Sequence, residues 1–364
     1  MKILLLGEYS NVHATLAEGL RQLGHRVTVV SNGDFWKNYP RDYSLVRRPG
    51  KLGGAMLTLK LLSLLPKLRG YDVVQLINPM FFELKAERIL PVYRYLRRNN
   101  GKVVLGAFGM DWYWVNTCIE KKPLRYSDFN LGDTLRTNTD ALKERRDWLG
   151  TAKGRLNRLI ADDCDGIVAG LYEYLVCYKD AFPQKTTFIP FPIKASPVAT
   201  VPPCGDKLRL FIGINRERSE YKGTDIMLRA AQCVQERHPD RVELRIAESV
   251  PFAQYVRMMD GSDAILDQLY SYTPSMNSLE AMSRGLICIG GGEEEGYRIL
   301  GENELRPIVN VLPDYNSVVN ALEQLVTHPE RIAMLKWQSM EYIRRHHDYI
   351  KVARQYEDFY NRLG

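Results

Sequence analysis

The chain has 364 residues, 45% hydrophobic and 26% charged, which is typical of a globular protein and favours two domains over one core. The net charge of +7 suggests an anionic partner, such as a nucleotide, a phospholipid headgroup or a nucleic acid. No segment has the ~18 apolar residues that a membrane span needs, and the six cysteines show neither C-x-x-C pairs nor metal-type spacing. These features indicate a soluble or peripheral protein with reduced thiols in the cytoplasm.

The first half of the chain alternates short apolar runs with helical patterns. The opening run, residues 2–7, is too short for a signal peptide and predicts a buried strand, followed by a helix that Gly24 is placed to end. Further strands are predicted at 26–31, 72–77, 102–108 and 166–170. Because these runs are apolar throughout, they indicate a parallel sheet with helices on both faces. We therefore expect a doubly wound α/β domain over residues 1–190.

Two segments of this half interrupt the alternation. In the first, seven basic residues surround the apolar sequence AMLTLKLLSLLPKL: Arg41, Arg47, Arg48, Lys51, Lys60, Lys67 and Arg69. This pattern fits a helix lying on an anionic membrane, and equally a buried helix with basic ends. The second, residues 112–150, is a long insertion that carries Trp112, Tyr113, Trp114, Tyr126 and Trp148. Its aromatic residues suit sugar rings and the choice of an acceptor, or else form a satellite core.

A proline-rich stretch at 191–207 reads as an interdomain linker, and the alternation then begins again. Strands are predicted at 208–213, 242–247, 263–268, 286–291 and 307–312, with a helix from Asp225 to His238. A second Rossmann-like domain is expected over 208–345, followed by a terminal helix over 346–364 on which His346 and His347 are solvent-exposed. Two such sheets would face a cleft, with ligands beyond the carboxyl ends of the strands.

The loop after the strand at 208–213 carries Arg216, Arg218 and Lys222, and then Gly223 leads into a helix. Cations beside the carboxyl edge of a sheet can neutralise a diphosphate, and they would stabilise it as a leaving group in glycosyl transfer. The alternative is a solvated loop in which Lys222 and Gly223 only turn the chain.

The segment from Tyr270 to Gly292 places Glu280 in the first turn of a short helix, ahead of three glycines. A helix start attracts anions such as a diphosphate, and a glutamate just inside it can hold a ribose diol. The alternative is a capping box in which Asn277 and Glu280 only close the helix start. No G-x-G-x-x-G, P-loop, H-E-x-x-H or G-x-S-x-G motif is present, and no D-x-D motif in the insertion calls for a metal.

Taken together, GLRQLGHRVTVVS, FGMDW, KTTFIPFPI, IGINRERSEYKG and SLEAMSRGLICIGGG resemble segments of the GT-B glycosyltransferases of the group 1 (family 4) kind. The resemblance covers nearly the whole chain. It implies two Rossmann-like domains facing a cleft, a last helix that crosses back to the first domain, and sugar transfer from a nucleotide-sugar, commonly with retention of configuration. The implied donor-binding residues are Arg216, Arg218, Lys222, Asn277, Ser278, Glu280 and Gly291.

The sequence departs from that family at one position, because Tyr272 stands where the first of two paired glutamates is usual. This phenol replaces a contact to the donor sugar or to the reaction centre. In the first domain, where the family binds its acceptor, the candidates are Asp111, which could accept a hydroxyl proton, and His13 in the first loop. A helix cap for Asp111 and a structural role for His13 are the alternatives.

The sequence therefore predicts a cytoplasmic hexosyltransferase-like enzyme, in contact with the inner face of a membrane, that passes a sugar to a glycan or lipid-linked glycan. Its donor is a nucleoside diphosphate sugar, with UDP as the default, and no metal or nucleic acid is required. Two alternatives stay open, a nucleotide-sugar epimerase and a catalytically silent donor-binding subunit of a polysaccharide assembly complex.

Overall fold

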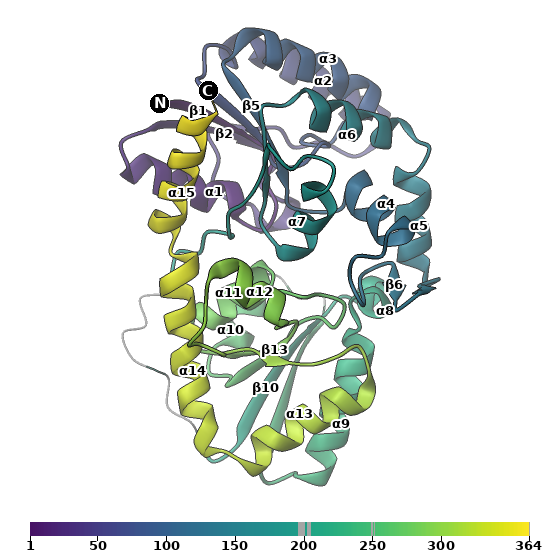
Figure 1. Ribbon diagram of the computed structural model, residues 1–364, viewed down its shortest axis with the longest axis vertical. Helices are drawn as coiled ribbons and strands as arrows, with labels where there is room; N and C mark the ends of the chain where they lie inside the picture. The colour runs from purple at the N-terminus through teal and green to yellow at the C-terminus, as the bar shows by residue number, and fades with distance from the viewer. Residues whose placement is uncertain (196–200, 202–204, 249, 251, 364) are drawn as a thin grey trace. The chain divides into compact units, whose positions relative to one another are not determined.

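The computed structural model describes residues 1–195, 201, 205–248, 250 and 252–363, so that much of the predicted linker, 196–200 and 202–204, lies outside the described residues. The chain forms two compact units (Figure 1). Unit 1 contains residues 1–123, 143–192 and 349–364, and unit 2 contains residues 124–142 and 193–348.

Unit 1 is built on a seven-stranded sheet in the order β3-β2-β1-β4-β5-β8-β9, in which all neighbours are parallel. The strands are β1 (Lys2–Leu6), β2 (Arg26–Ser31), β3 (Tyr43–Ser44), β4 (Val73–Leu76), β5 (Lys102–Ala107), β8 (Gly166–Ala169) and β9 (Thr186–Phe188). The five strands predicted for this half are confirmed, and the central ones are buried on both faces as their apolar sequences require.

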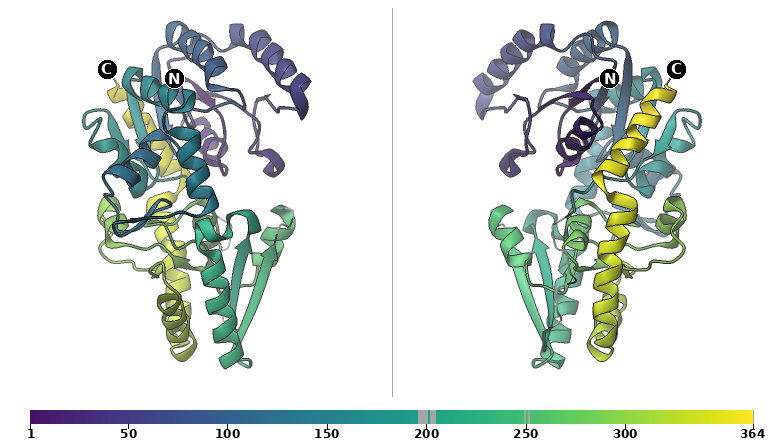
Figure 2. Two further views of the ribbon diagram at one scale, coloured as in Figure 1. Left: turned by 90° about the vertical axis from the view of Figure 1, so that its right-hand side faces the viewer. Right: turned by 90° about the vertical axis from the view of Figure 1, so that its left-hand side faces the viewer.

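The helices of unit 1 cover both faces of this sheet. They are α1 (Val12–Gln22), α2 (Gly50–Leu64), α3 (Ala86–Asn99), α4 (Trp112–Glu120), α6 (Ala152–Asp163), α7 (Tyr172–Lys179) and α15 (Tyr349–Arg362), together with the end of α5 (Thr139–Trp148). Helix α15, the last helix of the chain (Figure 2), packs on α1. At Gly19 of α1, a Cβ atom would lie 2.6 Å from the carbonyl oxygen of Tyr349. A glycine is therefore required for this close helix contact.

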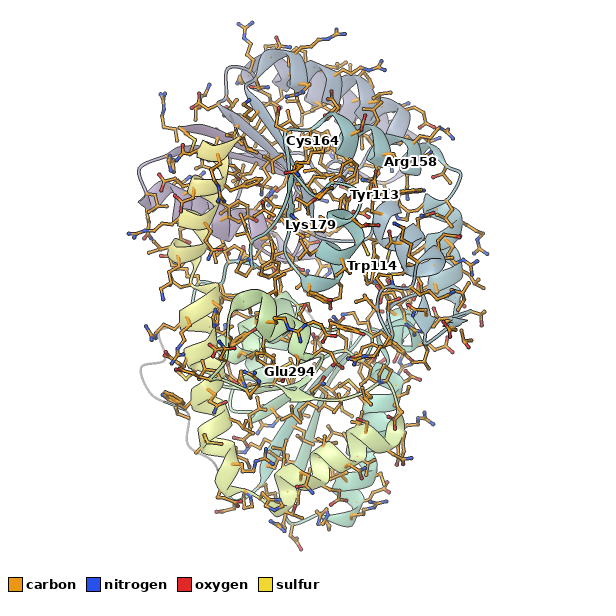
Figure 3. All side chains as sticks on the ribbon, viewed as in Figure 1. Tyr113, Trp114, Arg158, Cys164, Lys179 and Glu294 are labelled. Carbon is orange, nitrogen blue, oxygen red and sulfur yellow. The ribbon has the colours of Figure 1, made fainter. Side chains whose placement is uncertain are left out.

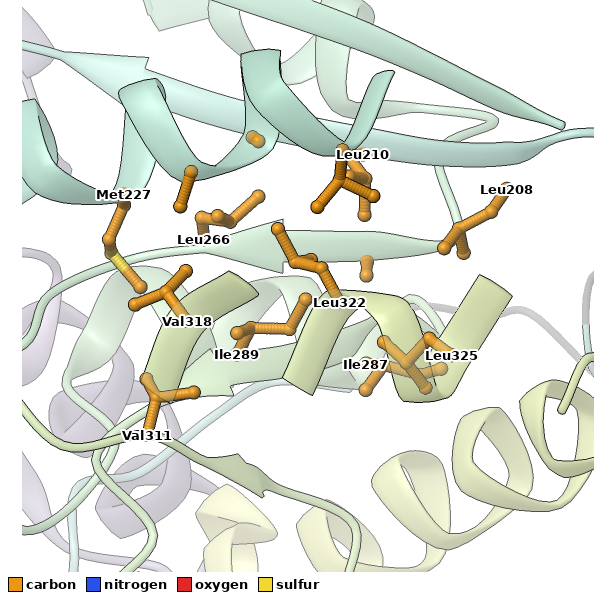
Figure 4. Packing of buried hydrophobic residues seen from close by; sticks show 14 of the residues in the cluster. Leu208, Leu210, Met227, Leu266, Ile287, Ile289, Val311, Val318, Leu322 and Leu325 are labelled. Atoms are coloured by element: carbon orange, nitrogen blue, oxygen red, sulfur yellow. The ribbon is translucent and has the colours of Figure 1, made fainter. Parts of the chain in front are cut away.

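Unit 2 is built on a five-stranded parallel sheet in the order β11-β10-β12-β13-β14. Its strands are β10 (Leu208–Ile214), β11 (Val242–Glu248), β12 (Ala264–Leu266), β13 (Ile287–Gly290) and β14 (Val309–Asn310), which confirms the five strands predicted here. Its helices are α8 (Ser219–Lys222), α9 (Thr224–Arg237), α10 (Phe252–Met259), α11 (Met276–Ser283), α12 (Glu294–Leu300), α13 (Tyr315–Thr327) and α14 (Glu330–Tyr342). Leucine and isoleucine side chains of β10, β12 and β13 pack against α9 and α13 to form the core (Figure 4).

Residues 124–142, named the strap here, come from the predicted insertion in the first half of the chain but belong to unit 2. The strap contains a small antiparallel hairpin of β6 (Asn130–Leu131) and β7 (Thr134–Leu135) and ends in the first turn of α5. The rest of the insertion belongs to unit 1, where Tyr113 and Trp114 are buried on α4 (Figure 3). These two side chains form a satellite core.

The prediction for the histidine pair near the C-terminus is wrong. His346 and His347 lie on a π-helical turn, Ile343–His347, rather than on an exposed terminal helix. The His347 side chain is buried, and the His346 ring lies 2.7 Å from a carboxylate oxygen of Glu302. The charged residues around the pair had suggested exposure, whereas α14 and this turn pack on α11.

Candidate functional site

The carboxyl ends of β10, β12 and β13 lie side by side in the sheet of unit 2, so the loops that follow them share one edge. These loops hold most of the predicted binding residues. In doubly wound sheets this edge is where ligands bind.

The loop after β10 carries the three predicted cations in different surroundings. Arg216 is exposed and pairs with Glu248 at the end of β11, and the Arg218 guanidinium lies 4.9 Å from the ring centre of Tyr221. The half-buried Lys222 ammonium has no ion-pair partner among the described residues. Lys222 is therefore the cation of this loop that is best placed to take an anionic ligand.

The backbone around Lys222 is closely held. The carbonyl oxygen of Lys222 accepts a hydrogen bond from the Leu269 N–H at 2.9 Å, which joins this loop to the one after β12. Gly223 follows with a φ of 77°, and a Cβ atom there would lie 2.9 Å from the Leu269 side chain. A positive φ and this close approach both require glycine.

Helix α11 begins two residues earlier relative to Glu280 than the sequence suggested. Its N-cap is Ser275, so Asn277 is the second helical residue and Glu280 the fifth. The predicted place of Glu280 in the first turn is therefore wrong, and so is the capping-box alternative. Instead, the partly exposed Glu280 carboxylate accepts hydrogen bonds from Arg284, one turn later, at 2.8 and 3.0 Å.

Asp267, directly after β12, is a site residue that sequence reasoning missed. Its buried carboxylate accepts hydrogen bonds from Ser275, Asn277 and Ser278, at 3.2, 3.0 and 2.7 Å. The predicted binding residues Asn277 and Ser278 thus orient the start of α11 through Asp267. The signal in the sequence is an acid at the end of the apolar run DAILDQ, a run whose composition indicates only a strand.

Tyr272 contacts the strap. Its phenol oxygen accepts a hydrogen bond from the Arg125 N–H at 2.7 Å, and its ring lies 4.8 Å from that of Tyr126. The buried Glu293 carboxylate pairs with Arg125 and accepts a hydrogen bond from the Tyr126 hydroxyl at 2.6 Å. Burial raises the pKa of Tyr272.

Gly291, in the loop between β13 and α12, has no room for a side chain. A Cβ atom there would overlap the backbone carbonyl of Ser271, since the two atoms would lie 1.9 Å apart. This glycine permits close packing of two loops of the protein itself. Whether it also permits a close approach of the donor stays a prediction.

Asp111 and His13 belong to unit 1, apart from the residues above. The fully buried Asp111 carboxylate caps α4 by accepting a hydrogen bond from the Trp114 N–H at 2.9 Å, and it accepts another from the Tyr178 hydroxyl at 2.6 Å. Burial raises the pKa of Asp111 to about 6. A capping role, one of the two alternatives for this residue, is thus present.

His13 is also fully buried, within a chain of hydrogen bonds. Its Nδ1–H donates to the carbonyl oxygen of Gly7 at 2.9 Å, and its Nε2 accepts from the Gln75 amide at 3.2 Å. The Gln75 carbonyl in turn accepts from the Tyr360 hydroxyl at 2.6 Å. Burial lowers the pKa of His13 from 6.5 to about 3, so the ring is neutral at physiological pH.

A cavity of about 800 Å³ lies in unit 1 at the carboxyl ends of β1, β4 and β5. Its lining includes Glu8, Asn78, Trp148 and the cations Arg47 and Lys153, but neither Asp111 nor His13. The Glu8 carboxyl group accepts hydrogen bonds from two N–H groups at the start of α1, and burial raises its pKa to about 8. The sequence did not point to Glu8.

The structure therefore brings Lys222, Asn277, Ser278 and Glu280 to one edge of unit 2, and it places Asp111 and His13 below the surface of unit 1. Among the described residues, no group of three or more His, Cys, Asp or Glu side chains is arranged to hold a metal ion.

Neither a protein-family model nor a curated protein sequence matches the chain. Solved structures do match it over its whole length. The chain is similar to HepE from Anabaena, crystallised with UDP and glucose, at 14% identity and a TM-score of 0.58, covering 98% of each chain. It is also similar to sucrose-phosphate synthase from Thermosynechococcus elongatus, at 14% identity and a TM-score of 0.61, covering 100% of this chain and 99% of that one.

The catalytic domain of starch synthase IV from Arabidopsis thaliana, bound to ADP and acarbose, is similar at 11% identity and a TM-score of 0.57, covering 100% of this chain and 99% of that one. At these identities the likeness is one of fold. Together with the two parallel, helix-covered sheets, it shows that the chain has the GT-B fold of two Rossmann-like domains.

Proposed function

We propose that the protein is a glycosyltransferase that moves a sugar from a nucleoside diphosphate sugar, UDP by default, to a hydroxyl of a glycan or lipid-linked glycan, with retention of configuration. The observation that carries the proposal is the Lys222 ammonium, which has no ionic partner in the described part of the chain and lies in a turn that is hydrogen-bonded to the loop ahead of α11. A cationic side chain and the N-terminus of a helix, both beyond the carboxyl ends of the strands, favour the binding of a diphosphate. The GT-B fold and the UDP in the HepE structure support this choice.

In this proposal Lys222, with Arg216 or Arg218, binds the diphosphate and stabilises it as it leaves, while Glu280 binds the ribose. Because Arg284 holds the Glu280 carboxylate, the ribose hydroxyls would share that carboxylate with Arg284 or displace it. The cavity in unit 1 is the proposed acceptor site, since it is large enough for a sugar and has both aromatic and charged walls. The roles of Asp111, His13 and Tyr272 in catalysis, and that of Gly291 in donor binding, stay predictions.

Replacing Lys222 or Glu280 by alanine is expected to weaken UDP binding by about tenfold to a hundredfold, the range for losing hydrogen bonds to a charged group. Isothermal titration with UDP, after a thermal-shift comparison of UDP, GDP and ADP, measures this effect. Lys207→Ala is the matched control, because Lys207 is an exposed lysine of unit 2 that donates to the Pro239 carbonyl, away from the site. Unchanged affinity in both site variants would refute the site.

A donor-binding subunit without activity is the second candidate, and one observation favours it. The phenol at position 272 is already engaged by the strap, so the contact that the usual glutamate makes has no evident substitute there. Incubation of the protein with UDP-sugars and glycan acceptors, followed by mass spectrometry, separates the two. A new glycosidic product supports the enzyme, whereas donor binding without product supports the silent subunit, and donor turnover without acceptor would indicate the epimerase.

We also propose that the protein attaches to the inner membrane surface through α2, which lies beside α3 at the periphery of unit 1 (Figures 1 and 2). One face of α2 is buried, but Leu52, Met56, Leu59 and Leu62 on the other are 50–81% exposed. A helix with apolar side chains on all of its faces needs apolar contacts on both sides. Between Asp42 and Asp72 there are six basic residues and no acidic residue. An anionic lipid surface therefore matches the charge of this segment and can cover the exposed apolar face of α2.

Wild-type protein is expected to co-sediment with vesicles containing 30% phosphatidylglycerol more than with pure phosphatidylcholine vesicles, and Met56→Glu is expected to abolish most of that binding. Met334→Glu is the matched control, because both methionines are 50% exposed on helices. Equal sedimentation of both variants, or no binding of the wild type, would refute attachment through α2. No helix in the described part of the chain is long and apolar enough to cross a membrane.

A further inference from the structure

The strap contacts the loop that carries Lys222 through the side chains of Arg136 and Asp128. The Arg136 guanidinium donates to the carbonyl oxygens of Glu220 and Tyr221, at 2.7 and 3.1 Å. One face of the guanidinium lies 3.3 Å from the ring centre of Tyr270, in the loop after β12. Arg136 thus joins the loops after β10 and β12 at the sheet edge where the donor is proposed to bind.

The two carbonyl groups that Arg136 binds are at the end of α8, where helical carbonyls have no partner within the helix. The next carbonyl, that of Lys222, accepts the hydrogen bond from Leu269. Three successive carbonyls therefore each have a donor from outside the helix, and these hydrogen bonds restrain the backbone of the turn that follows. A helix of only four residues has little stability of its own, so these outside donors are what hold it.

Arg136 itself is held by the strap. Its guanidinium also donates to the carbonyl oxygens of Ser127 and Asp128, at 3.2 and 3.3 Å, and the Asp128 carboxylate accepts a hydrogen bond from the Tyr221 hydroxyl at 2.6 Å. The planar fork of arginine can satisfy several acceptors and stack on an aromatic ring at once, which a lysine cannot do. The partly buried guanidinium is thus held by carbonyl groups of the strap and by those of α8.

We propose that Arg136 is a positioning residue for the donor diphosphate, because it fixes the α8 turn from which Lys222 reaches the ligand. The strap is thereby part of the donor-binding machinery, although it lies some 85 residues before that turn in the chain. The inference rests on the proposed function, since it assigns Arg136 to the same diphosphate site. Arg136 acts through Lys222 and does not touch the ligand.

The test measures binding of UDP, inorganic pyrophosphate and uridine by isothermal titration. Arg136→Ala is expected to weaken UDP and pyrophosphate about tenfold and to leave uridine unchanged, because only the phosphate contact depends on the turn. Arg136→Lys should recover part of the loss. The Arg136→Ala/Lys222→Ala double variant should bind UDP no more weakly than Lys222→Ala alone, because both changes remove one contact.

Arg237→Ala is the matched control, since Arg237 is also an arginine of unit 2 but pairs with Glu323 rather than with α8. It is expected to bind UDP as the wild type does. If Arg136→Ala does not fold, Arg136→Gln takes its place, because glutamine keeps an N–H donor but loses the fork and the charge.

The outcomes separate the two proposals. If the wild type binds neither nucleoside diphosphates nor pyrophosphate, the proposed function fails and this inference with it. If Lys222→Ala weakens UDP while Arg136→Ala or Arg136→Gln binds it as the wild type does, only the role of Arg136 is overturned. A loss that is equal for UDP and uridine would also overturn it, because that result indicates general damage to unit 2.

Discussion

Replacing Lys336 by alanine is expected to lower the free energy of unfolding of unit 2 by about 3–5 kcal/mol, because it leaves a buried carboxylate without its counter-charge. The Lys336 ammonium on α14 lies 2.8 Å from Asp263, and the two side chains are 1% and 3% exposed. Asp263 also accepts a hydrogen bond from the Arg209 N–H at the start of β10, so the pair ties α14 to the sheet. Urea denaturation, with hydrogen exchange of β10 and β12 as a local measure, tests this.

Two further variants make the test specific. Lys336→Met combined with Asp263→Asn removes both charges, and most of the lost stability should return, since uncharged side chains of similar volume often replace a buried ion pair without loss. Arg237→Ala breaks the exposed pair with Glu323 and should leave the denaturation midpoint unchanged. A loss below about 1 kcal/mol in Lys336→Ala would show that the buried pair does not stabilise unit 2.

On acidification, His13 is expected to lower the stability of unit 1, whereas the raised pKa values of Glu8, about 8, and Asp111, about 6, act in the opposite direction. Because the pKa of the His13 ring is about 3 in the folded protein and 6.5 in the unfolded chain, the ring is neutral in both states above pH 6.5 and its full contribution to stability is present there. As the pH falls from 6.5 towards 3, only the unfolded chain takes up the proton on His13, so the contribution of this ring to the free energy of unfolding falls. At ~1.4 kcal/mol per unit the loss reaches roughly 4–5 kcal/mol.

The hydrogen bonds explain why the folded protein resists this proton. Nε2 of His13 accepts from the Gln75 amide, and Gln75 cannot turn its carbonyl towards the ring without losing the Tyr360 hydroxyl. His13→Asn is expected to be less stable than the wild type at pH 7.5, and this difference in urea midpoint should shrink as the pH is lowered to 4, since the contributions of Glu8 and Asp111 are common to both proteins. The exposed His328→Asn should keep the wild-type slope. Parallel curves for wild type and His13→Asn would contradict the assignment.

The fold was largely predictable because its strands are buried on both faces and are therefore apolar throughout, which separates them clearly from amphipathic helices. The missed strands β3, β6, β7 and β9 have two or three residues each, too few to show a period. The membership of the strap in unit 2 could not be predicted either. It depends on contacts of Arg136, Tyr126 and Arg125 with residues at least 84 positions away, in a polar segment without periodicity.

The candidate site was predictable to the extent that residue type and loop position determine it. Lys222 and Gly223 lie in the predicted turn, because a cation followed by glycine between a strand and a helix is a local pattern. Asp267 was missed because its role depends on three hydroxyl and amide donors brought to it by the start of α11. The hydrogen bond between Tyr272 and Arg125 was equally hidden, since nothing near position 272 indicates a partner 147 residues earlier.

The carboxyl group of Glu8 makes the two Rossmann-like halves unequal in their capacity to hold a phosphate. It accepts hydrogen bonds from the His13 and Ala14 N–H groups at the start of α1. It thereby occupies the helix start at which such a fold can hold a phosphate. The corresponding first strand of unit 2 ends instead in a loop whose lysine has no ion-pair partner among the described residues. The same architecture is thus used twice with different outcomes: a carboxyl group of the protein itself fills the helix start of unit 1, whereas the loop of unit 2 keeps a cation for the nucleotide that we propose it binds.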